Sequence, residues 1–310
     1  MSRIFLSSRR VIAAALEESA WVVHLHDPEL LPGVSKLARS GARVIFDAHE
    51  DLPRQVLTKP YLWVWQRRIL AWILEYYERH VCSKAAAIVA ATPAIGEKFG
   101  GVHERTVVIN NYPLALTVSR QQEERNLSKI VYVGAINEIR GIRQLVTALD
   151  ILDGEVTLDL CGRLRTKALA DELASMSGWR HVRYHGQVSR ETAHALMASS
   201  GAALLNFLPA PNHLEAQPNK LFEYLAAGVP LVASDFPLWR SILAQGPCGE
   251  MMNPLSPPDI ARAIKEVLSD KAKNSTLSLN FRLVSKRYLW DQECEKLIDL
   301  YETLEPPKIN

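Results

Sequence analysis

The sequence has few cysteines and almost no net charge, and each shortage excludes a class of protein. Its four cysteines form no C-x-x-C pair and have no zinc-finger spacing with histidine, so we expect neither a disulfide framework nor a structural metal. Lys and Arg number 36 against 34 Asp and Glu, a formal net charge of +2. This balance argues against a dedicated nucleic-acid-binding protein, and nucleic acid is not an expected partner.

The sequence also lacks a long apolar run. The longest stretch without a charged residue, residues 192–214, contains histidines, serines, asparagines and prolines, too polar for a span of about 20 apolar residues. Near the N-terminus, the apolar run stops at Glu17 and Glu18 without a small-residue cleavage pattern. We therefore expect a cytoplasmic protein with no signal peptide and no membrane span.

Short β-branched runs alternate with helical patterns along most of the 310 residues. Four runs come first, WVVHLHD, ARVIFDAHE, AAIVAAT and RTVVIN, and then KIVYVGA, VTLDLCG, HVRYHGQV, GAALLNF and VPLVASD. Such runs between amphipathic helices are typical of buried parallel strands, which predicts an α/β, doubly wound fold. The polar segment SRQQEERN separates the groups, so we expect a first domain over 1–125, a second over 126–285 and a last helix over 286–304.

Residues 212–235, NHLEAQPNKLFEYLAAGVPLVASD, have the pattern of an anion-binding helix start. Pro218 and Asn219 suit the beginning of a short helix over 220–227, with Asn219 as the N-cap, and Gly228 suits its end. The first-turn amides carry partial positive charge and Lys220 adds a full one, so together they suit a phosphate group. Glu223, one turn further on, suits the vicinal hydroxyls of a ribose.

Two glutamates in this segment, Glu215 and Glu223, are separated by seven residues. A solvated helix start with two surface carboxylates is the alternative interpretation. The segment resembles the donor-nucleotide motif of glycosyltransferase family 4, also called glycosyl transferases group 1, whose paired glutamates precede a Gly-x-Pro-led strand, here Gly228 and Pro230. The resemblance implies that Glu223 holds the ribose and that Glu215 lies near the donor sugar. It also implies donor contacts at the residues after the first glutamate, Asn219, Lys220 and Leu221.

A second segment, VYVGAINEIRGIRQLVTAL, resembles the strand, loop and helix that open the family's C-terminal domain. The resemblance implies that Gly134 makes a tight turn and that Arg140 reaches the donor diphosphate, shared with Lys220. Cations positioned in this way stabilise the charge that develops on a leaving nucleoside diphosphate. A surface arginine at a helix start is the alternative for Arg140. Further along, Gly186 and Val188 fall where the family's loops meet the nucleobase.

The first half carries histidines at expected strand ends. His49, in DAHE, matches a family histidine that hydrogen-bonds the donor sugar, and His26 and Asp27 fall on the acceptor side. We interpret His24 as a packing residue. His24, His26 and Asp27 suggest a metal site, but no further ligands stand at a convincing spacing, so we expect none.

Residues 60–79, PYLWVWQRRILAWILEYYER, predict an amphipathic helix. Its apolar side chains at three- and four-residue spacing are Leu62, Trp65, Ile69, Trp72 and Tyr76. Tryptophans beside the paired arginines Arg67 and Arg68 suit a helix that docks on anionic lipid. A core helix packed on the sheet is the alternative.

The resemblance implies a GT-B-like fold of two Rossmann-like domains facing a cleft, with the last helix returning to the first domain. Only 23 residues precede His24, enough for one helix, where family members have two or three βα units of about 30 residues each. We therefore expect an incomplete N-terminal domain. A start codon placed too far downstream, natural shortening and a partner chain that supplies strands are three explanations.

The function implied is that of bacterial surface-polysaccharide enzymes. A hexosyl group would pass from a nucleotide diphospho-sugar to a hydroxyl of a glycan or lipid-linked sugar, with retention of configuration and with no metal or other cofactor. Two alternatives stay open. The chain could be a non-catalytic donor-binding subunit that completes a partner, or a GT-B-fold sugar-nucleotide epimerase that needs no acceptor.

Overall fold

The computed structural model describes residues 2–59, 61–114, 125–210, 213–214, 216–269 and 271–304. The chain divides into two compact units, Met1–Asn111 with Asp291–Asn310, and Tyr112–Trp290. The boundary predicted from the sequence lies at residue 125, further along the chain than this division. Residues 115–124, just before it, lie outside the described ones. The last helix is grouped with the first unit, where the family resemblance also places it.

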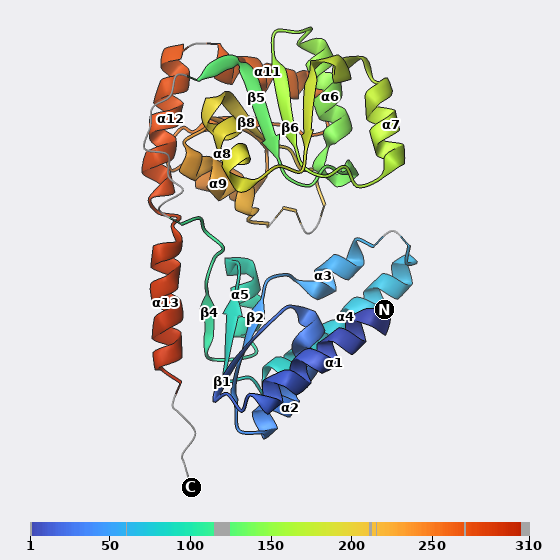
Figure 1. Cartoon of the computed structure of the whole chain (residues 1–310), viewed down its shortest axis with the longest axis vertical. Helices are drawn as coiled ribbons and strands as arrows, with labels where there is room; N and C mark the ends of the chain where they lie inside the picture. The colour runs from blue at the N-terminus through green and yellow to red at the C-terminus, as the bar shows by residue number, and fades with distance from the viewer. Residues whose placement is uncertain are drawn as a thin grey trace. The chain divides into compact units, whose positions relative to one another are not determined.

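The first unit contains a four-stranded parallel sheet in the order β1-β2-β3-β4 (Figure 1). Its strands are β1 (Val22–His26), β2 (Arg43–Ala48), β3 (Ala87–Ala90) and β4 (Thr106–Val108). All four correspond to predicted runs. The register pairs His26 with Asp47 and His24 with Ile45, so the polar ends of β1 and β2 come together at the carboxyl edge of the sheet.

The helices of this unit include one before β1, as the 23 residues ahead of His24 predict. They are α1 (Ser2–Glu17), η1 (Pro28–Leu30), α2 (Leu31–Arg39), α3 (Leu52–Leu57), α4 (Val64–Cys82), α5 (Pro93–Gly100) and α13 (Trp290–Glu302). Ile12 of α1, Val34 of α2 and Val81 of α4 share a core with Phe46 and Ile88 of the sheet. α2 packs against both α1 and α4 (Figure 1).

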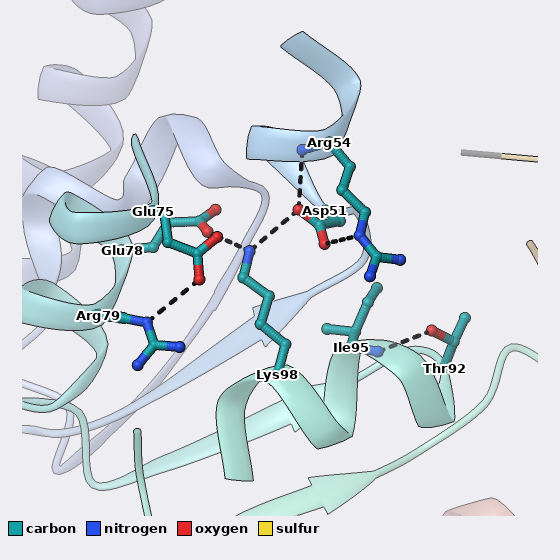
Figure 2. A network of polar contacts seen from close by, with 8 residues as sticks. All are labelled: Asp51, Arg54, Glu75, Glu78, Arg79, Thr92, Ile95 and Lys98. Atoms are coloured by element: carbon teal, nitrogen blue, oxygen red, sulfur yellow. Dashed lines mark hydrogen bonds and ion pairs between the residues drawn. The ribbon is translucent and has the colours of Figure 1, made fainter. Parts of the chain in front are cut away.

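A buried ion-pair network joins α4, α5 and the loop after β2 (Figure 2). Lys98 of α5 donates to Glu78 of α4 at 2.6 Å and to Asp51 at 3.2 Å. Asp51 also accepts from the backbone N–H of Arg54 at 3.1 Å and so caps α3. Asp51, two residues after His49, therefore fixes the loop that carries His49, because its side chain contacts both α3 and Lys98 of α5.

The second unit contains a six-stranded parallel sheet in the order β10-β9-β8-β5-β6-β7. Its strands are β5 (Asn126–Val133), β6 (Thr157–Cys161), β7 (Val182–Gly186), β8 (Ser200–Leu205), β9 (Leu231–Ser234) and β10 (Gly249–Met252). The first five were predicted. β10 was missed, because GEMM is short and has no β-branched residue.

Helices cover both faces of this sheet, as a doubly wound fold requires. They are η3 (Glu138–Arg140), α6 (Ile142–Ile151), α7 (Lys167–Ser175), η4 (Ser177–His181), α8 (Arg190–Ser199), α9 (Asn219–Ala227), α10 (Pro237–Leu243), α11 (Pro257–Leu268) and α12 (Lys271–Ser285). Ile130 packs in one buried cluster with α6, α7 and α11, and its neighbour Val131 packs in the other with α8, α9 and α10. Within the described part of the chain, no helix combines the length and apolarity needed to cross a bilayer.

Candidate active site

The second sheet has a topological switch point between β5 and β8. From β5 the chain proceeds through β6 and β7 on one side, and then through β8, β9 and β10 on the other (Figure 1). Loops diverge at such a point, and the crevice beyond the carboxyl ends of the two strands is where open α/β sheets bind ligands. Gly134 directly follows β5 and Asn206 directly follows β8. The two loops that start at these residues therefore border the crevice.

Three glycines, Gly134, Gly162 and Gly186, stand where β5, β6 and β7 end, and their backbones pack directly on one another. Gly162 donates its N–H to Gly186 at 2.7 Å, and Gly134 donates to the carbonyl of Cys161 at 2.9 Å. A Cβ added at Gly162 would lie 1.8 Å from the carbonyl oxygen of Gly134, so no side chain fits there. Gly134, where the sequence predicts a tight turn, is one of the glycines packed in this way.

Arg140, in the segment after β5, stacks its guanidinium on an aromatic ring from the segment after β8. Its backbone N–H donates to Asn137 Oδ1 at 3.2 Å, and its guanidinium carbon lies 3.4 Å from the ring centre of Phe207, after β8. Nη1 is buried and has no hydrogen-bond partner among the described residues. Burial lowers the pKa of Arg140. The side chain is therefore not the freely solvated surface arginine of the alternative interpretation. Sequence reasoning missed Phe207, since nothing local marks an aromatic ring as a platform for a distant cation.

α9 spans Asn219–Ala227 with Gly228 as its C-cap, close to the predicted range. The predicted N-cap is wrong: Pro218 occupies that position, because its φ of −68° and ψ of 133° are extended and helical geometry starts one residue later. Leu221 is fully buried and its N–H donates to the Pro218 carbonyl at 2.9 Å, so neither its side chain nor its amide is exposed to a ligand, and the predicted donor contact at Leu221 is not supported. Glu215 lies outside the described residues.

Lys220 and Glu223, which the sequence assigned to different parts of one ligand, form an ion pair with each other. Both side chains are about one-third exposed. The helix that carries them is fixed to β5, because the buried Tyr224 hydroxyl accepts the N–H of Val133 at 2.9 Å. Burial raises the pKa of Tyr224, so the hydroxyl stays neutral.

Three further residues of the second unit, Tyr132, Gly186 and Val188, lie at or just beyond the carboxyl ends of β5 and β7. Tyr132 donates its hydroxyl to the Ala135 carbonyl at 2.9 Å and fixes the loop after Gly134, and burial raises the pKa of Tyr132 to about 12. Gly186 closes β7 with a φ of +66°. Val188, two residues on, is half-buried against the core cluster that contains α9.

In the first unit, three histidines surround one carboxylate. Oδ2 of Asp47 lies 3.5 Å from His24 Nε2, 3.2 Å from His26 Nδ1 and 3.5 Å from His49 Nε2. His24 is also hydrogen-bonded through Nδ1 to the Tyr301 hydroxyl of α13 at 2.8 Å. The sequence suggested His26 and His49 separately, but their convergence with His24 on Asp47 requires the sheet register and was not predicted.

His26 and Asp27, the acceptor-side predictions, are both exposed. Asp27 has a φ of +74°, an uncommon conformation for a residue other than glycine, and it precedes η1 directly. The pKa of His26 lies below its ordinary value, chiefly because partial burial disfavours the imidazolium, against the opposing effect of Asp47. Its imidazole is therefore neutral at neutral pH.

α4 buries a different side from the one its apolar stripe suggests. Trp65, Trp72 and Tyr76 are 62%, 70% and 67% exposed, and Ile69 is 52% exposed. The buried residues of the helix are Ala71, Glu78, Val81 and Cys82. α4 therefore packs on the core as the alternative predicts, but through Val81 and Cys82, and the aromatic stripe stays exposed.

A family model described as glycosyl transferases group 1 matches residues 117–284, more than half of the chain. The chain belongs to the glycosyl transferases group 1 family. The matched range contains Gly134, Arg140, Lys220 and Glu223.

Among curated relatives, the glycosyl transferases group 1 chain is 23% identical to a phosphatidyl-myo-inositol mannosyltransferase of Mycolicibacterium smegmatis over 292 residues, which is 91% of this chain and 71% of that protein. It is 25% identical over 177 residues to a D-inositol 3-phosphate glycosyltransferase of Xylanimonas cellulosilytica, 56% of this chain and 41% of that protein. A glycogen synthase of Mycobacterium tuberculosis is 27% identical over 184 residues, 57% of this chain and 43% of that protein. The chain thus spans less than half the length of the last two.

Among solved structures, HepE of Anabaena in complex with UDP and glucose is similar with a TM-score of 0.74 and 16% identity, over 96% of this chain and 81% of that one. Sucrose-phosphate synthase of Thermosynechococcus elongatus also has a TM-score of 0.74, with 17% identity, over 97% of this chain and 79% of that one. The predicted GT-B fold with two parallel α/β sheets is confirmed.

Proposed function

We propose that this glycosyl transferases group 1 chain moves a hexosyl group from a nucleotide diphospho-sugar to a hydroxyl of a glycan or lipid-linked sugar. The observation that carries the proposal is Arg140. Its guanidinium is stacked on Phe207, one buried nitrogen has no partner among the residues that the structure describes, and a buried cation is costly unless an anion compensates it. A diphosphate at the switch point supplies that anion.

A helix N-terminus and a second cation support the same ligand. α9 has nine residues, its first amides carry partial positive charge, and Lys220 lies in its first turn. A bound diphosphate would attract Lys220 away from Glu223, which frees that carboxylate for ribose hydroxyls. Arg140 and Lys220 then stabilise the leaving nucleoside diphosphate without a metal ion. Gly186 and Val188 contact the base in this arrangement, and Asn219 contacts the phosphates.

Relatives support the substrate classes. HepE was solved with UDP and glucose, and the M. smegmatis relative is by name a mannosyltransferase acting on a phosphatidyl-inositol. We assign His49 and Glu215 to the donor sugar and His26 and Asp27 to the acceptor, with retention of configuration. Polysaccharide biosynthesis is the process in which such a transfer takes place.

Donor binding tests the proposal. The purified chain would be titrated with UDP-, GDP- and dTDP-sugars, and nucleoside diphosphate release would be followed with membrane extract as acceptor. Arg140→Ala should weaken donor binding about tenfold or more, since a hydrogen bond to a charged group contributes about 1.5–3 kcal/mol. Arg143→Ala is the matched control, because Arg143 lies three residues on and is already paired with Glu138 and Glu172.

The outcome separates the alternatives. Acceptor-dependent release that Arg140→Ala lowers and Arg143→Ala preserves would support the transferase. Binding without release would favour a donor-binding subunit that needs a partner chain. Conversion of the donor sugar without acceptor would favour an epimerase, and equal binding by both variants would contradict the site.

The exposed face of α4 supports action at the cytoplasmic side of a membrane. Trp65, Ile69, Trp72 and Tyr76 recur at four- and three-residue intervals and share one side of the helix. Arg68 is exposed on the same helix, and Arg67 donates to the carbonyls of Leu62 and Leu57. Aromatic side chains with nearby arginines are the composition that binds the interface of anionic lipid.

Vesicle binding tests this part separately. The chain should co-sediment with vesicles that contain phosphatidylglycerol and much less with phosphatidylcholine alone. A Trp65→Ser, Trp72→Ser double variant should lose most of this binding, whereas Trp21→Ser removes a tryptophan that is 43% exposed outside α4 and should not. Equal sedimentation of both variants would contradict docking through α4.

A further inference from the structure

The carboxyl ends of β1 and β2 place several metal-ligating atoms around one point. His24 Nε2, His26 Nδ1 and Asp47 Oδ2 all lie within 4.8 Å of one another. His49 Nε2 lies 3.1 Å from His26 Nδ1 and 3.5 Å from Asp47 Oδ2. A tetrahedron of ligands about 2.1 Å from zinc has edges of about 3.4 Å, close to the contacts of 3.1–3.5 Å above, although His49 lies outside the compact group formed by His24, His26 and Asp47.

The cluster is short of hydrogen-bonding partners. Asp47 is buried, and its Oδ1 has no hydrogen-bond partner among the described residues. His24 Nε2 is buried and unpartnered in the same way. A buried polar atom without a partner is costly, and a cation bound at Asp47 Oδ2 would satisfy His24 Nε2 and offset the negative charge of a carboxylate whose Oδ1 has no partner among the described residues.

Tyr301 fixes which nitrogen of His24 faces the cluster. Its hydroxyl is hydrogen-bonded to Nδ1 at 2.8 Å, which directs Nε2 toward Asp47. Histidines that bind metals usually hydrogen-bond through their second nitrogen in this way, because the contact sets the tautomer and the ring orientation. The stacked rings of His26 and His49 are 55% and 30% exposed and have space to turn their lone pairs toward a common centre.

We propose that His24 Nε2, His26 Nδ1 and Asp47 Oδ2 bind one zinc ion in the first unit, with His49 Nε2 turning toward it as the fourth ligand. Three imidazoles and one carboxylate form a ligand set that suits zinc, and oxygen-seeking Mg²⁺ would not select it. The site involves none of the residues proposed to hold the donor diphosphate. It was not predicted from the sequence, because the ligands come from two strands and the loop after β2, and the strand register decides their proximity.

Metal binding to the purified, chelator-treated chain tests the proposal without any measurement of activity. Titration with ZnCl₂ should give one zinc per chain, and Co²⁺ should give the visible absorption of a tetrahedral site. His26→Ala and His49→Ala, at the two more exposed ligands, should each weaken zinc binding at least about tenfold, and the double variant should remove it. His185→Ala is the control, since His185 pairs with Asp159 at 2.7 Å in the second unit.

Thermal unfolding supplies a second readout. Zinc should raise the Tm of the wild-type chain and of His185→Ala, because a ligand that binds only the folded state stabilises it. It should not raise the Tm of the double variant, whose own folding is checked by its circular dichroism. Absence of binding by the wild-type chain, or binding that the double variant retains, would overturn the proposal.

A consequence for activity rests additionally on the proposed function. If His49 contacts the donor sugar, a bound zinc withdraws it, and added zinc should lower transfer by the wild-type chain. Failure of this effect alone would count against the sugar contact, whereas failure of zinc binding would count against the metal site.

Discussion

Tyr301 and His24 are 277 residues apart in sequence and joined by a hydrogen bond of 2.8 Å. Through this contact α13, near the C-terminus, holds the end of β1, near the N-terminus. A second contact acts alongside it: the carboxylate of Glu293, also in α13, is buried and accepts both the backbone N–H of Asn110 at 2.7 Å and its side-chain amide at 3.2 Å. α13 is thereby an integral part of the first unit.

Removing the Tyr301 hydroxyl should destabilise the first unit. Tyr301→Phe leaves His24 Nδ1 without its partner, and such a loss costs about 1 kcal/mol. Urea denaturation should show this decrease in the free energy of unfolding. Tyr61→Phe, at a side chain 75% exposed, should cost nothing measurable. Equal stability of the two variants would show that α13 holds β1 by other contacts.

Lys98→Met should be strongly destabilising at neutral pH. It removes the cation beside the buried Glu78 (Figure 2), and an uncompensated buried charge costs about 3–5 kcal/mol. Lys265→Met is the control, because Lys265 and Glu155 form an exposed pair worth at most about 1 kcal/mol. Urea denaturation of both variants measures the difference.

The cost of Lys98→Met should shrink as the pH falls. Burial already raises the pKa of Glu78 above 4.5, although the nearby Lys98 partly lowers it. Removing Lys98 should therefore raise the pKa of Glu78 further. A folded-state pKa above the unfolded value means that the folded state binds more protons, so stability increases as the pH drops toward the unfolded value. Unfolding at neutral pH and at about pH 5 should show the variant recovering relative to wild type, and a constant difference would contradict this origin.

Glycines at the ends of β6 and β7 should respond differently to alanine. Gly162→Ala places a Cβ 1.8 Å from the Gly134 carbonyl oxygen and should disrupt the second unit and its donor binding. Gly186→Ala meets no atom within 4 Å and carries only the strain of a φ of +66°, about 1–2 kcal/mol. Thermal unfolding and donor titration of both variants test this, and similar losses would contradict the backbone packing.

Chelation should leave sugar transfer intact. Arg140 and Lys220 supply the positive charge at the diphosphate, so transfer measured in EDTA should match transfer in Mg²⁺. Lys220→Ala should then lower the rate without creating a requirement for Mg²⁺. Loss of transfer in EDTA that Mg²⁺ restores would contradict the proposed metal-independent mechanism.

The sequence by itself determined the alternation of strands and helices and the glycines at strand ends, because these follow from local periodicity and backbone conformation. Its resemblance to two motifs of the family also marked Arg140, Lys220 and Glu223. Nine strands were predicted where strands lie, and β10 was missed because its four residues carry no local signal.

Only the tertiary structure decided which distant side chains meet. The register of β1 and β2 brings three histidines to Asp47, and the return of α13 adds Tyr301. The stacking of Arg140 on Phe207 requires β5 and β8 to be neighbours in the sheet, and residue spacing in the sequence does not reveal that. The face of α4 that is buried was decided in the same way, since a helical period identifies an apolar stripe but not whether the fold provides a surface to cover it.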